Sequence, residues 1–350
     1  MNKTRIGLVF GGQSGEHEVS CVSASNVYKA IDQNKYEIIP IGIKKDGTWN
    51  IYRGDVENIA SGDWKTDKEN LQEDVGVFTE LKGDVDLFFP VLHGQMGEDG
   101  TIQGVFEMLG TPYVGCGVLA STVGMDKIMS KYAFEAADIP SCRYIPVTRY
   151  AWKHDRDVIE DKIVAELGLP VFVKPANMGS SVGISKAHSE EELFQAMDTA
   201  FSFDRRVIVE SFVNAHEIET AVLEEEGKIQ VAVPGEIIPA KEFYDYEAKY
   251  ESGDDSVIVI PAQLDQEILD QVVDYSRKAF EAVDGTGLAR VDFFVDKTTG
   301  AISINEINTM PGFTSISMYP KMWEASGIPY HELVERLIQT ASLKKNPTTE

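Results

Sequence analysis

The chain has 350 residues, of which 43% are hydrophobic and 25% charged, and no long biased tract interrupts it. This length exceeds the size at which a single core stops growing, so we expect two or three domains and exclude wholesale disorder. The formal net charge of −25 would repel a phosphate backbone, and no stretch rich in Lys and Arg offsets it, which excludes nucleic acid as a partner.

The cysteines and the first residues indicate the compartment. Cys21, Cys116 and Cys142 are an odd number without CxxC spacing, so neither a disulfide framework nor a thiolate zinc site is expected. The apolar run at residues 5–10 is too short for a signal-peptide core, and no run approaches the length of a membrane span. We therefore expect a cytoplasmic protein with no membrane partner.

The first third of the chain alternates strands and helices. Apolar runs at residues 5–10, 36–43 and 84–94 are typical of buried strands, and the spacing at 101–109 predicts a helix that stops at a glycine. This alternation predicts a parallel sheet. The polar stretch at residues 51–84 is weakly patterned, so we expect a surface excursion with little regular structure.

A new α/β unit begins after Met125, where we place a domain boundary. Residues 158–168 have helical spacing, and residues 169–175 form an apolar strand. Farther along, residues 217–237 alternate like the arms of an antiparallel hairpin, which makes the second half α+β. Residues 239–256 are a polar loop with four aromatic side chains, a composition typical of a lid that closes on a ligand.

Two late β runs joined by a KTTG turn predict a charged hairpin. If the turn is symmetric about Thr299, Asp292 faces Glu306 and Arg290 faces Asn308, because strand side chains repeat every two residues. Opposed carboxylates repel unless a cation lies between them, and oxygen ligands suit magnesium bridging a polyphosphate. Arg290 could then stabilise phosphoryl or oxyanion charge. The alternative is a surface hairpin with solvated charges.

Three glycine-rich turns are further candidate sites. KPANMGSSVGIS runs from one strand directly into another, and its backbone N–H groups could cover phosphates; the alternative is an ordinary glycine-rich hairpin. It is not a Walker loop, because GxxxxGK[ST] is absent and no helix is expected after it. Glu18 and His93 follow the first and third strands, where open parallel sheets bind ligands. The alternatives there are a capping acid and a hydrogen-bonded structural histidine.

Taken together, these motifs resemble those of the D-alanine:D-alanine ligases of the ATP-grasp superfamily. The matching segments keep the family's order along nearly the whole chain: GGQSGEHEVS, LHGQMGEDGTIQG, TPYVGCGVLAS, MDK, VKPANMGSSVG, YDYEAKY, ARVDFF and NEINTMPGFTSISM. The resemblance implies an α/β and α+β chain with an ATP-grasp fold. It implies a Rossmann-like substrate domain at 1–126, a central subdomain with the phosphate loop at 127–214, and a C-terminal subdomain with metal site and lid at 215–350.

The resemblance also implies a reaction and its cofactors. ATP would phosphorylate the carboxylate of one D-alanine, and the amine of a second would displace the phosphate, giving a dipeptide for peptidoglycan precursors. Two Mg²⁺ ions, with Mn²⁺ as a possible substitute, would assist, and the chain would form a homodimer. The implied metal ligands are Asp292, Glu306 and Asn308, with Glu306 bridging. The implied ATP contacts are Lys127 and Lys174 at the α- and β-phosphates, Lys249 at the γ-phosphate, Ser180 and Ser181 in the phosphate loop, Glu210 at the adenine amine and Glu217 at the ribose.

The substrate contacts follow from the same resemblance. Glu18 would hold the ammonium of the first D-alanine and connect through Ser180 to Tyr250 on the lid. The remaining implied contacts are Arg290 and the Gly312 N–H at the oxyanion, Ser317 and Met318 at the second carboxylate, and His93 at the substrate. Family members often have leucine in place of Met318. Tyr250 matches dipeptide-forming members, whereas phenylalanine there accompanies lactate acceptors. A D-alanine:D-lactate ligase and an inactive nucleotide-binding regulator are the alternatives.

Overall fold

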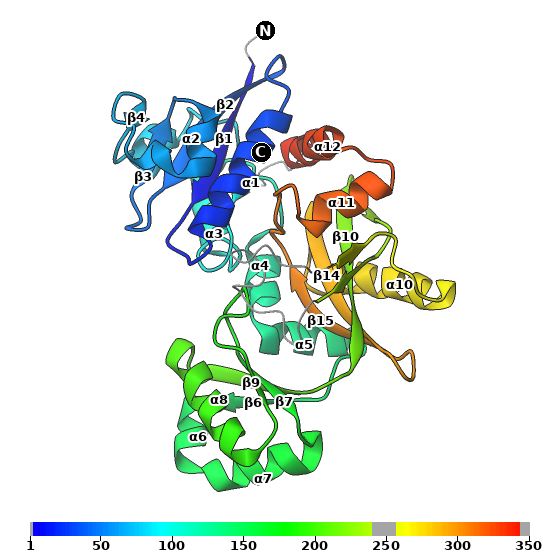
Figure 1. Ribbon diagram of the computed structural model, residues 1–350. Helices are drawn as coiled ribbons and strands as arrows, with labels where there is room; N and C mark the ends of the chain where they lie inside the picture. Colours follow the sequence, from blue (N-terminus) through cyan, green and yellow to red (C-terminus); the bar gives the residue numbers. More distant parts are fainter. Residues whose placement is uncertain (1–2, 240–256, 344–350) are drawn as a thin grey trace.

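A computed structural model of the chain describes residues 3–239 and 257–343. Figure 1 shows three sheets along the molecule: the N-terminal sheet at the top of the view, a six-stranded sheet in the middle and a four-stranded sheet at the bottom. Within the described residues, no helix is both long and apolar enough to cross a membrane. The predicted combination of an α/β first part and an α+β second part is confirmed.

The first sheet has the order β4-β3-β2-β1-β5. Its strands are β1 (Thr4–Gly11), β2 (Tyr36–Ile43), β3 (Trp49–Tyr52), β4 (Leu71–Gln72) and β5 (Leu87–Val91). The first two strands and β5 are parallel, as the alternation predicts, while β3 and β4 add antiparallel strands at one edge. Helices α1 (His17–Ala30) and α3 (Thr101–Leu109) follow β1 and β5, so the turns before them lie at the carboxyl edge of the sheet.

The expectation of little regular structure at residues 51–84 is wrong. Besides β3 and β4, this stretch contains α2 (Val56–Ser61), a 3₁₀ turn (Asp63–Lys65) and a π-helical turn (Val77–Leu81). Trp64 is fully buried, and its ring lies edge-on to Phe10 at 5.1 Å. A Cβ at Gly42 would lie 2.4 Å from that ring, so the glycine makes room for the indole. Such short elements show no periodicity, which is why the pattern did not predict them.

The four-stranded sheet has the order β6-β9-β7-β8, with every neighbouring pair antiparallel. Its strands are β6 (Tyr144–Thr148), β7 (Val171–Pro175), β8 (Ser185–Ala187) and β9 (Arg206–Ser211). Helices α6 (Arg149–His154), α7 (Arg156–Leu167) and α8 (Glu190–Phe203) supply apolar side chains to its core. The glycine-rich loop connects β7 to β8 without a helix, as predicted.

The six-stranded sheet has the order β13-β12-β10-β14-β15, with β11 also paired to β10. Its strands are β10 (Ala215–Glu225), β11 (Lys228–Val231), β12 (Gly235–Ile238), β13 (Val257–Val259), β14 (Leu288–Asp296) and β15 (Ile302–Asn308). Helix α10 (Gln266–Ala282) covers one face, and its apolar side chains share a core with β14 and β15.

Four more helices connect the sheets. Helices α4 (Val118–Met125) and α5 (Lys127–Ala136) pack on β15, so the proposed boundary at residue 126 falls between two helices that share one sheet. Helix α11 (Met318–Ala325) packs on β10, and α12 (Tyr330–Leu343) contacts α1 of the first part (Figure 1). Through the contact of α12 with α1, the last part of the chain lies against the first, and a cleft is found where the three parts meet.

Candidate active site

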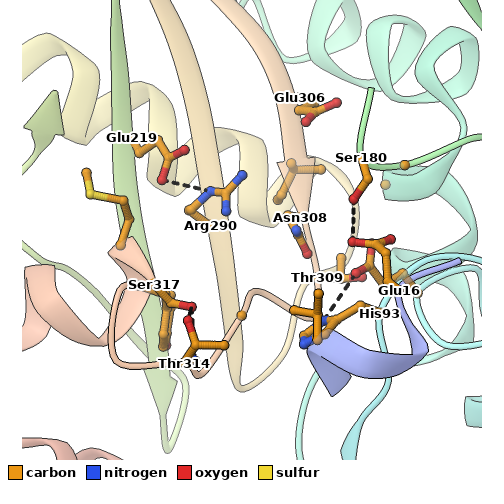
Figure 2. Close-up of a pocket in the computed structure, with 18 of the residues that line it drawn as sticks. Glu16, His93, Ser180, Glu219, Arg290, Glu306, Asn308, Thr309, Thr314 and Ser317 are labelled. Atoms are coloured by element: carbon orange, nitrogen blue, oxygen red, sulfur yellow. Dashed lines mark hydrogen bonds and ion pairs between the residues drawn. The ribbon is translucent and has the colours of Figure 1, made fainter. Parts of the chain in front are cut away.

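A cavity of about 560 Å³ lies at this junction and receives side chains from all three parts. Figure 2 shows polar groups from the turns after β1 and β5, the glycine-rich loop and the charged hairpin pointing into it. The predicted site residues that line it are His93, Lys127, Ser180, Arg290, Glu306, Asn308, Gly312, Ser317 and Met318. Residues far apart in sequence, with complementary chemistry, therefore share one space.

The hairpin register that the sequence predicts is confirmed where it carries charge. Arg290 lies opposite Asn308, and Asp292 lies opposite Glu306. Beyond Asp292 the register shifts by one, so that Asn305 is an additional residue in β15. Such a bulge redirects side chains, and here the Asn305 Oδ1 accepts a hydrogen bond from the Lys174 Nζ at 3.3 Å.

The three predicted metal ligands offer only oxygen atoms. Asp292 accepts hydrogen bonds from the Arg290 Nε at 2.8 Å and Nη2 at 2.7 Å, and the Lys127 Nζ lies 3.6 Å from the Glu306 Oε2. In the described part of the chain, no three His, Cys, Asp or Glu side chains form a metal cage. Two carboxylates and one amide oxygen instead suit Mg²⁺ that arrives with a polyphosphate, because this ion keeps ligands from water and substrate.

Arg290 is held by two carboxylates in the wall of the cavity. Its Nε lies 3.1 Å from the Glu219 Oε2, and Asp292 binds the same guanidinium. Burial lowers the pKa of Arg290, but Asp292 and Glu219 raise it well above its ordinary value. Sequence reasoning missed Glu219, although strand alternation in EIETAV places Glu217 and Glu219 on one face, and Glu219 pairs with Asp292.

The predicted connection between Glu18 and Ser180 is wrong: Glu16 takes that position. The Ser180 hydroxyl donates a hydrogen bond to the Glu16 carboxylate, which lines the cavity (Figure 2). Glu18 instead forms an ion pair with Lys45 at 2.9 Å, and its side chain is 63% exposed. Because α1 begins at His17, the side chain two residues beyond Glu16 is turned away by about 200°.

The glycine-rich loop lies over the cavity in an uncommon conformation. Ser180 and Ser181 have φ values of 48° and 60°, in the left-handed region that non-glycine residues seldom adopt. Such conformations persist where the surroundings impose them, often at ligand-binding loops. The Lys127 Nζ donates a hydrogen bond to the Met178 carbonyl at 2.7 Å, which connects the first residue of α5 to the loop.

Lys174 and Glu210 do not line this cavity; they form a buried ion cluster between β7 and β9. The Lys174 Nζ is 2.5 Å from the Glu210 Oε2, and the Lys131 Nζ is 2.9 Å from the Glu210 Oε1. Burial raises the pKa of Glu210, but the two lysines hold it well below its usual range. Sequence reasoning missed Lys131, although Lys127 and Lys131 lie four residues apart on one face of α5.

His93 is buried at the floor of the cavity beside another acid that sequence reasoning missed. Its Nδ1 lies 3.7 Å from the Glu98 Oε1, and its Nε2 is 3.1 Å from the Ser23 hydroxyl. Burial lowers the pKa of His93, but Glu98 raises it above its ordinary value overall, while burial raises the pKa of Glu98. The pair therefore favours holding a proton inside the site.

The opposite end of the cavity is the start of α11. Ser317 precedes the helix and Met318 is its first residue, so backbone N–H groups and the helix dipole favour a carboxylate there. A Cβ at Gly312 would lie 2.7 Å from the Ser317 Oγ, so a larger residue there would require that hydroxyl to move. The Ser317 hydroxyl is fixed by Thr314 at 2.8 Å.

Besides Glu18, Lys174 and Glu210, five predicted site residues lie away from the cavity or beyond the described ranges. Asp292, Ser181 and Glu217 are not among the residues that line it. Lys249 and Tyr250 lie outside the described residues. Their implied roles stay predictions.

Comparison with known proteins agrees with this geometry. Residues 5–116 match the family model described as D-ala D-ala ligase N-terminus, and residues 133–339 match D-ala D-ala ligase C-terminus. The D-alanine--D-alanine ligase of Acetivibrio thermocellus is 50% identical, over 99% of this chain and 97% of that protein. That of Ruminiclostridium cellulolyticum is 49% identical, over 97% of this chain and 96% of that protein.

Solved structures show the same likeness in three dimensions. The VanG D-Ala:D-Ser ligase from Enterococcus faecalis superposes with a TM-score of 0.88 at 38% identity, covering 97% of this chain and all of that one. The D-alanine-D-alanine ligase from Coxiella burnetii gives 0.84 at 34% identity, covering 98% and 94%. The predicted ATP-grasp fold is confirmed, and the chain belongs to the D-alanine–D-alanine ligase family.

Proposed function

We propose that this chain joins two D-alanine molecules at the expense of ATP. The observation that carries the proposal is that one cavity holds the charged hairpin, the glycine-rich loop and the start of α11 together. Relatives about half identical over almost their full length bear the name of this activity. In the reaction, ATP phosphorylates the first carboxylate, and the second amine displaces phosphate through a tetrahedral intermediate. No side chain needs to form a covalent adduct, so positioning and charge stabilisation supply the catalysis.

The hairpin face is the cation site in this proposal. Asp292, Glu306 and Asn308 would hold two Mg²⁺ ions, or Mn²⁺ in their place, and these would neutralise charge on the phosphates. Lys127 lies between Glu306 and the glycine-rich loop, so it can contact a phosphate under that loop. The predicted lid residues Lys249 and Tyr250 would close over the phosphates together with the glycine-rich loop.

The two amino acid subsites would lie at opposite ends of the cavity, on either side of the charged hairpin. Glu16, positioned by Ser180, would bind the ammonium of the first D-alanine. Arg290 and the Gly312 N–H would stabilise the oxyanion of the tetrahedral intermediate, where such donors contribute most. Ser317 and the amino end of α11 would receive the carboxylate of the second D-alanine. Closure over both subsites would exclude water from the acyl phosphate.

The proposal also covers the oligomeric state of the chain and its location in the cell. We expect a homodimer in the cytoplasm, supplying the dipeptide for peptidoglycan precursors. Light scattering on the purified chain tests the assembly, and a monomer at working concentration would overturn that part.

The function is tested by phosphate release with ATP, Mg²⁺ and a panel of acceptors. The panel should include D-serine, because the VanG structure is titled a D-Ala:D-Ser ligase. It should also include D-lactate, because this acceptor has a hydroxyl group in place of the ammonium group. We expect D-alanine to be preferred and D-alanyl-D-alanine to be the product by mass spectrometry. Preference for D-serine or D-lactate would overturn the acceptor assignment, and no phosphate release with any acceptor would favour an inactive nucleotide-binding regulator.

A further inference from the structure

The buried cluster of Lys131, Lys174 and Glu210 contains one more cation than it contains anions. Lys131 comes from α5, Lys174 from β7 and Glu210 from β9, and all three are at most 8% exposed. Each lysine contacts a different oxygen of the same carboxylate, Lys131 at 2.9 Å and Lys174 at 2.5 Å. A buried charge is costly unless it is paired. One lysine is sufficient to pair the carboxylate, so the second is available to another anion.

The two lysines are held by different kinds of contact. The Lys131 Nζ also donates a hydrogen bond to the Ile304 carbonyl at 3.0 Å, so a carboxylate and a backbone group both fix it. Besides Glu210, the Lys174 Nζ has a longer contact of 3.3 Å to the Asn305 Oδ1 and, among the described residues, no hydrogen bond to a backbone group. Burial lowers the pKa of Lys174, but Glu210 and, more weakly, Glu306 on the charged hairpin raise this pKa above its ordinary value overall. Lys174 is therefore the lysine whose contacts extend to β15 of the charged hairpin, where the proposed function places the phosphates.

We propose that Lys131 is a positioning residue of the ATP site, the permanent counter-ion of Glu210 that allows Lys174 to move from that carboxylate to the phosphates. This inference rests on the proposed function. When Lys174 leaves, Lys131 keeps Glu210 ionised and in place. The released Glu210 oxygen then accepts a hydrogen bond from the 6-amino group of adenine. The cluster thus couples recognition of the base to capture of the triphosphate.

Removing the charge of Lys131 should keep Lys174 at Glu210. Its departure would leave a buried carboxylate without any cation, which is the costly case. ATP would then lose its phosphate contact and its 6-amino acceptor together. Purine riboside triphosphate, whose base has no 6-amino group, would lose only the phosphate contact.

The experiment compares Lys131→Met, Lys131→Arg and a matched control, Lys162→Met, in the full chain. Lys162 lies on α7, and its side chain is 55% exposed. Steady-state phosphate release with saturating D-alanine and Mg²⁺ gives kcat and KM for ATP and for purine riboside triphosphate. We expect Lys131→Met to raise KM for ATP at least about tenfold, to change kcat less, and to reduce the preference for ATP over the analogue. Lys131→Arg should restore most of the affinity for ATP and most of the preference for ATP over the analogue. Lys162→Met should match the unmodified chain.

A KM for ATP within about twofold of the unmodified chain in Lys131→Met, or an equal loss with both nucleotides, would overturn the inference. If Lys131→Met does not fold, the same comparison is made in a Glu210→Gln background, where no carboxylate needs a counter-ion. There, Lys131→Met should have little further effect on KM for ATP, and a further tenfold rise would count against the proposal. Phosphate release by the unmodified chain distinguishes failure of the proposed function from failure of this inference. If the unmodified chain releases no phosphate, the proposed function is refuted; if it does and the variants behave otherwise than expected, the role of Lys131 is refuted.

Discussion

Glu16 and Ser180 are 164 residues apart in sequence, yet the serine hydroxyl donates a hydrogen bond directly to the carboxylate. Glu16 stands at the start of α1 in the first part of the chain, and Ser180 stands in the loop between β7 and β8. In the proposed function, this contact would connect the subsite of the first D-alanine to the loop that covers the phosphates. Binding of ATP under that loop and orientation of the first D-alanine would then be coupled.

Glu16→Gln should lower kcat/KM for D-alanine about 100-fold, because a neutral amide neither attracts the ammonium nor holds Ser180 as strongly. Glu18→Gln is the matched control, since Glu18 is exposed and paired with Lys45. It should stay within about twofold of the unmodified chain. Steady-state phosphate release measures both. Equal losses in the two variants would show that the subsite is placed wrongly.

Glu219→Gln should lower kcat about tenfold and leave KM for ATP nearly unchanged. Glu219 lies 3.1 Å from the Arg290 Nε, whereas Asp292 binds both the Nε and the Nη2 and would keep these contacts in the variant. The guanidinium would keep its charge but lose part of its orientation toward the oxyanion. Steady-state kinetics with varied ATP separate the two constants. An increase confined to KM for ATP would assign Glu219 to the nucleotide instead.

Glu210→Gln should destabilise the protein at neutral pH and much less in acid. The folded-state pKa of Glu210 lies below its ordinary value of 4.5, so its contribution is present above that pH and is lost as the pH falls below it. Chemical denaturation across this range should show the variant and the unmodified chain converging on the acid side. Glu69→Gln is the control, because Glu69 is exposed. A difference that stays constant with pH would contradict the charge assignment.

Trp64→Ala should lower the free energy of unfolding by about 3–5 kcal/mol, because it empties a fully buried site against Phe10 and Gly42. Tyr150→Ala removes a large ring that is 74% exposed and should cost about 0.5 kcal/mol or less. Urea unfolding followed by circular dichroism compares the two. Similar small losses would mean that residues 51–84 contribute little to the first core.

Tyr250→Phe should retain ATP binding but shift acceptor choice toward lactate or increase ATP hydrolysis without product. Only the hydroxyl group is removed and the ring is kept, so binding of the nucleotide at the charged hairpin should persist. The ratio of phosphate released to dipeptide formed reports the change. If neither the ratio of phosphate to dipeptide nor the acceptor preference changes, Tyr250 has no role in closing the site.

The charged hairpin could be predicted because strand side chains alternate with a fixed period about a short turn. That rule placed Asp292 opposite Glu306 without any tertiary information. It did not predict the bulge at Asn305, since an inserted residue leaves no trace in an alternating pattern of this length.

Other parts of the site depend on details that a local pattern does not contain. Choosing Glu16 over Glu18 requires the first residue of α1, and helix ends are uncertain by one or two residues. The role of Lys131 depends on a carboxylate from β9 and a carbonyl from β15, both distant in sequence. Burial of Trp64 likewise depends on packing between short elements.

The central claim, that the opposed carboxylates of Asp292 and Glu306 gather divalent cations around a triphosphate, is tested most directly by Mn²⁺ binding. Electron paramagnetic resonance of the protein with a non-hydrolysable ATP analogue counts the bound ions. We predict two ions per chain, and loss of at least one in Glu306→Gln at an unchanged melting temperature. The same number of ions bound with the same affinity in that variant would contradict the account.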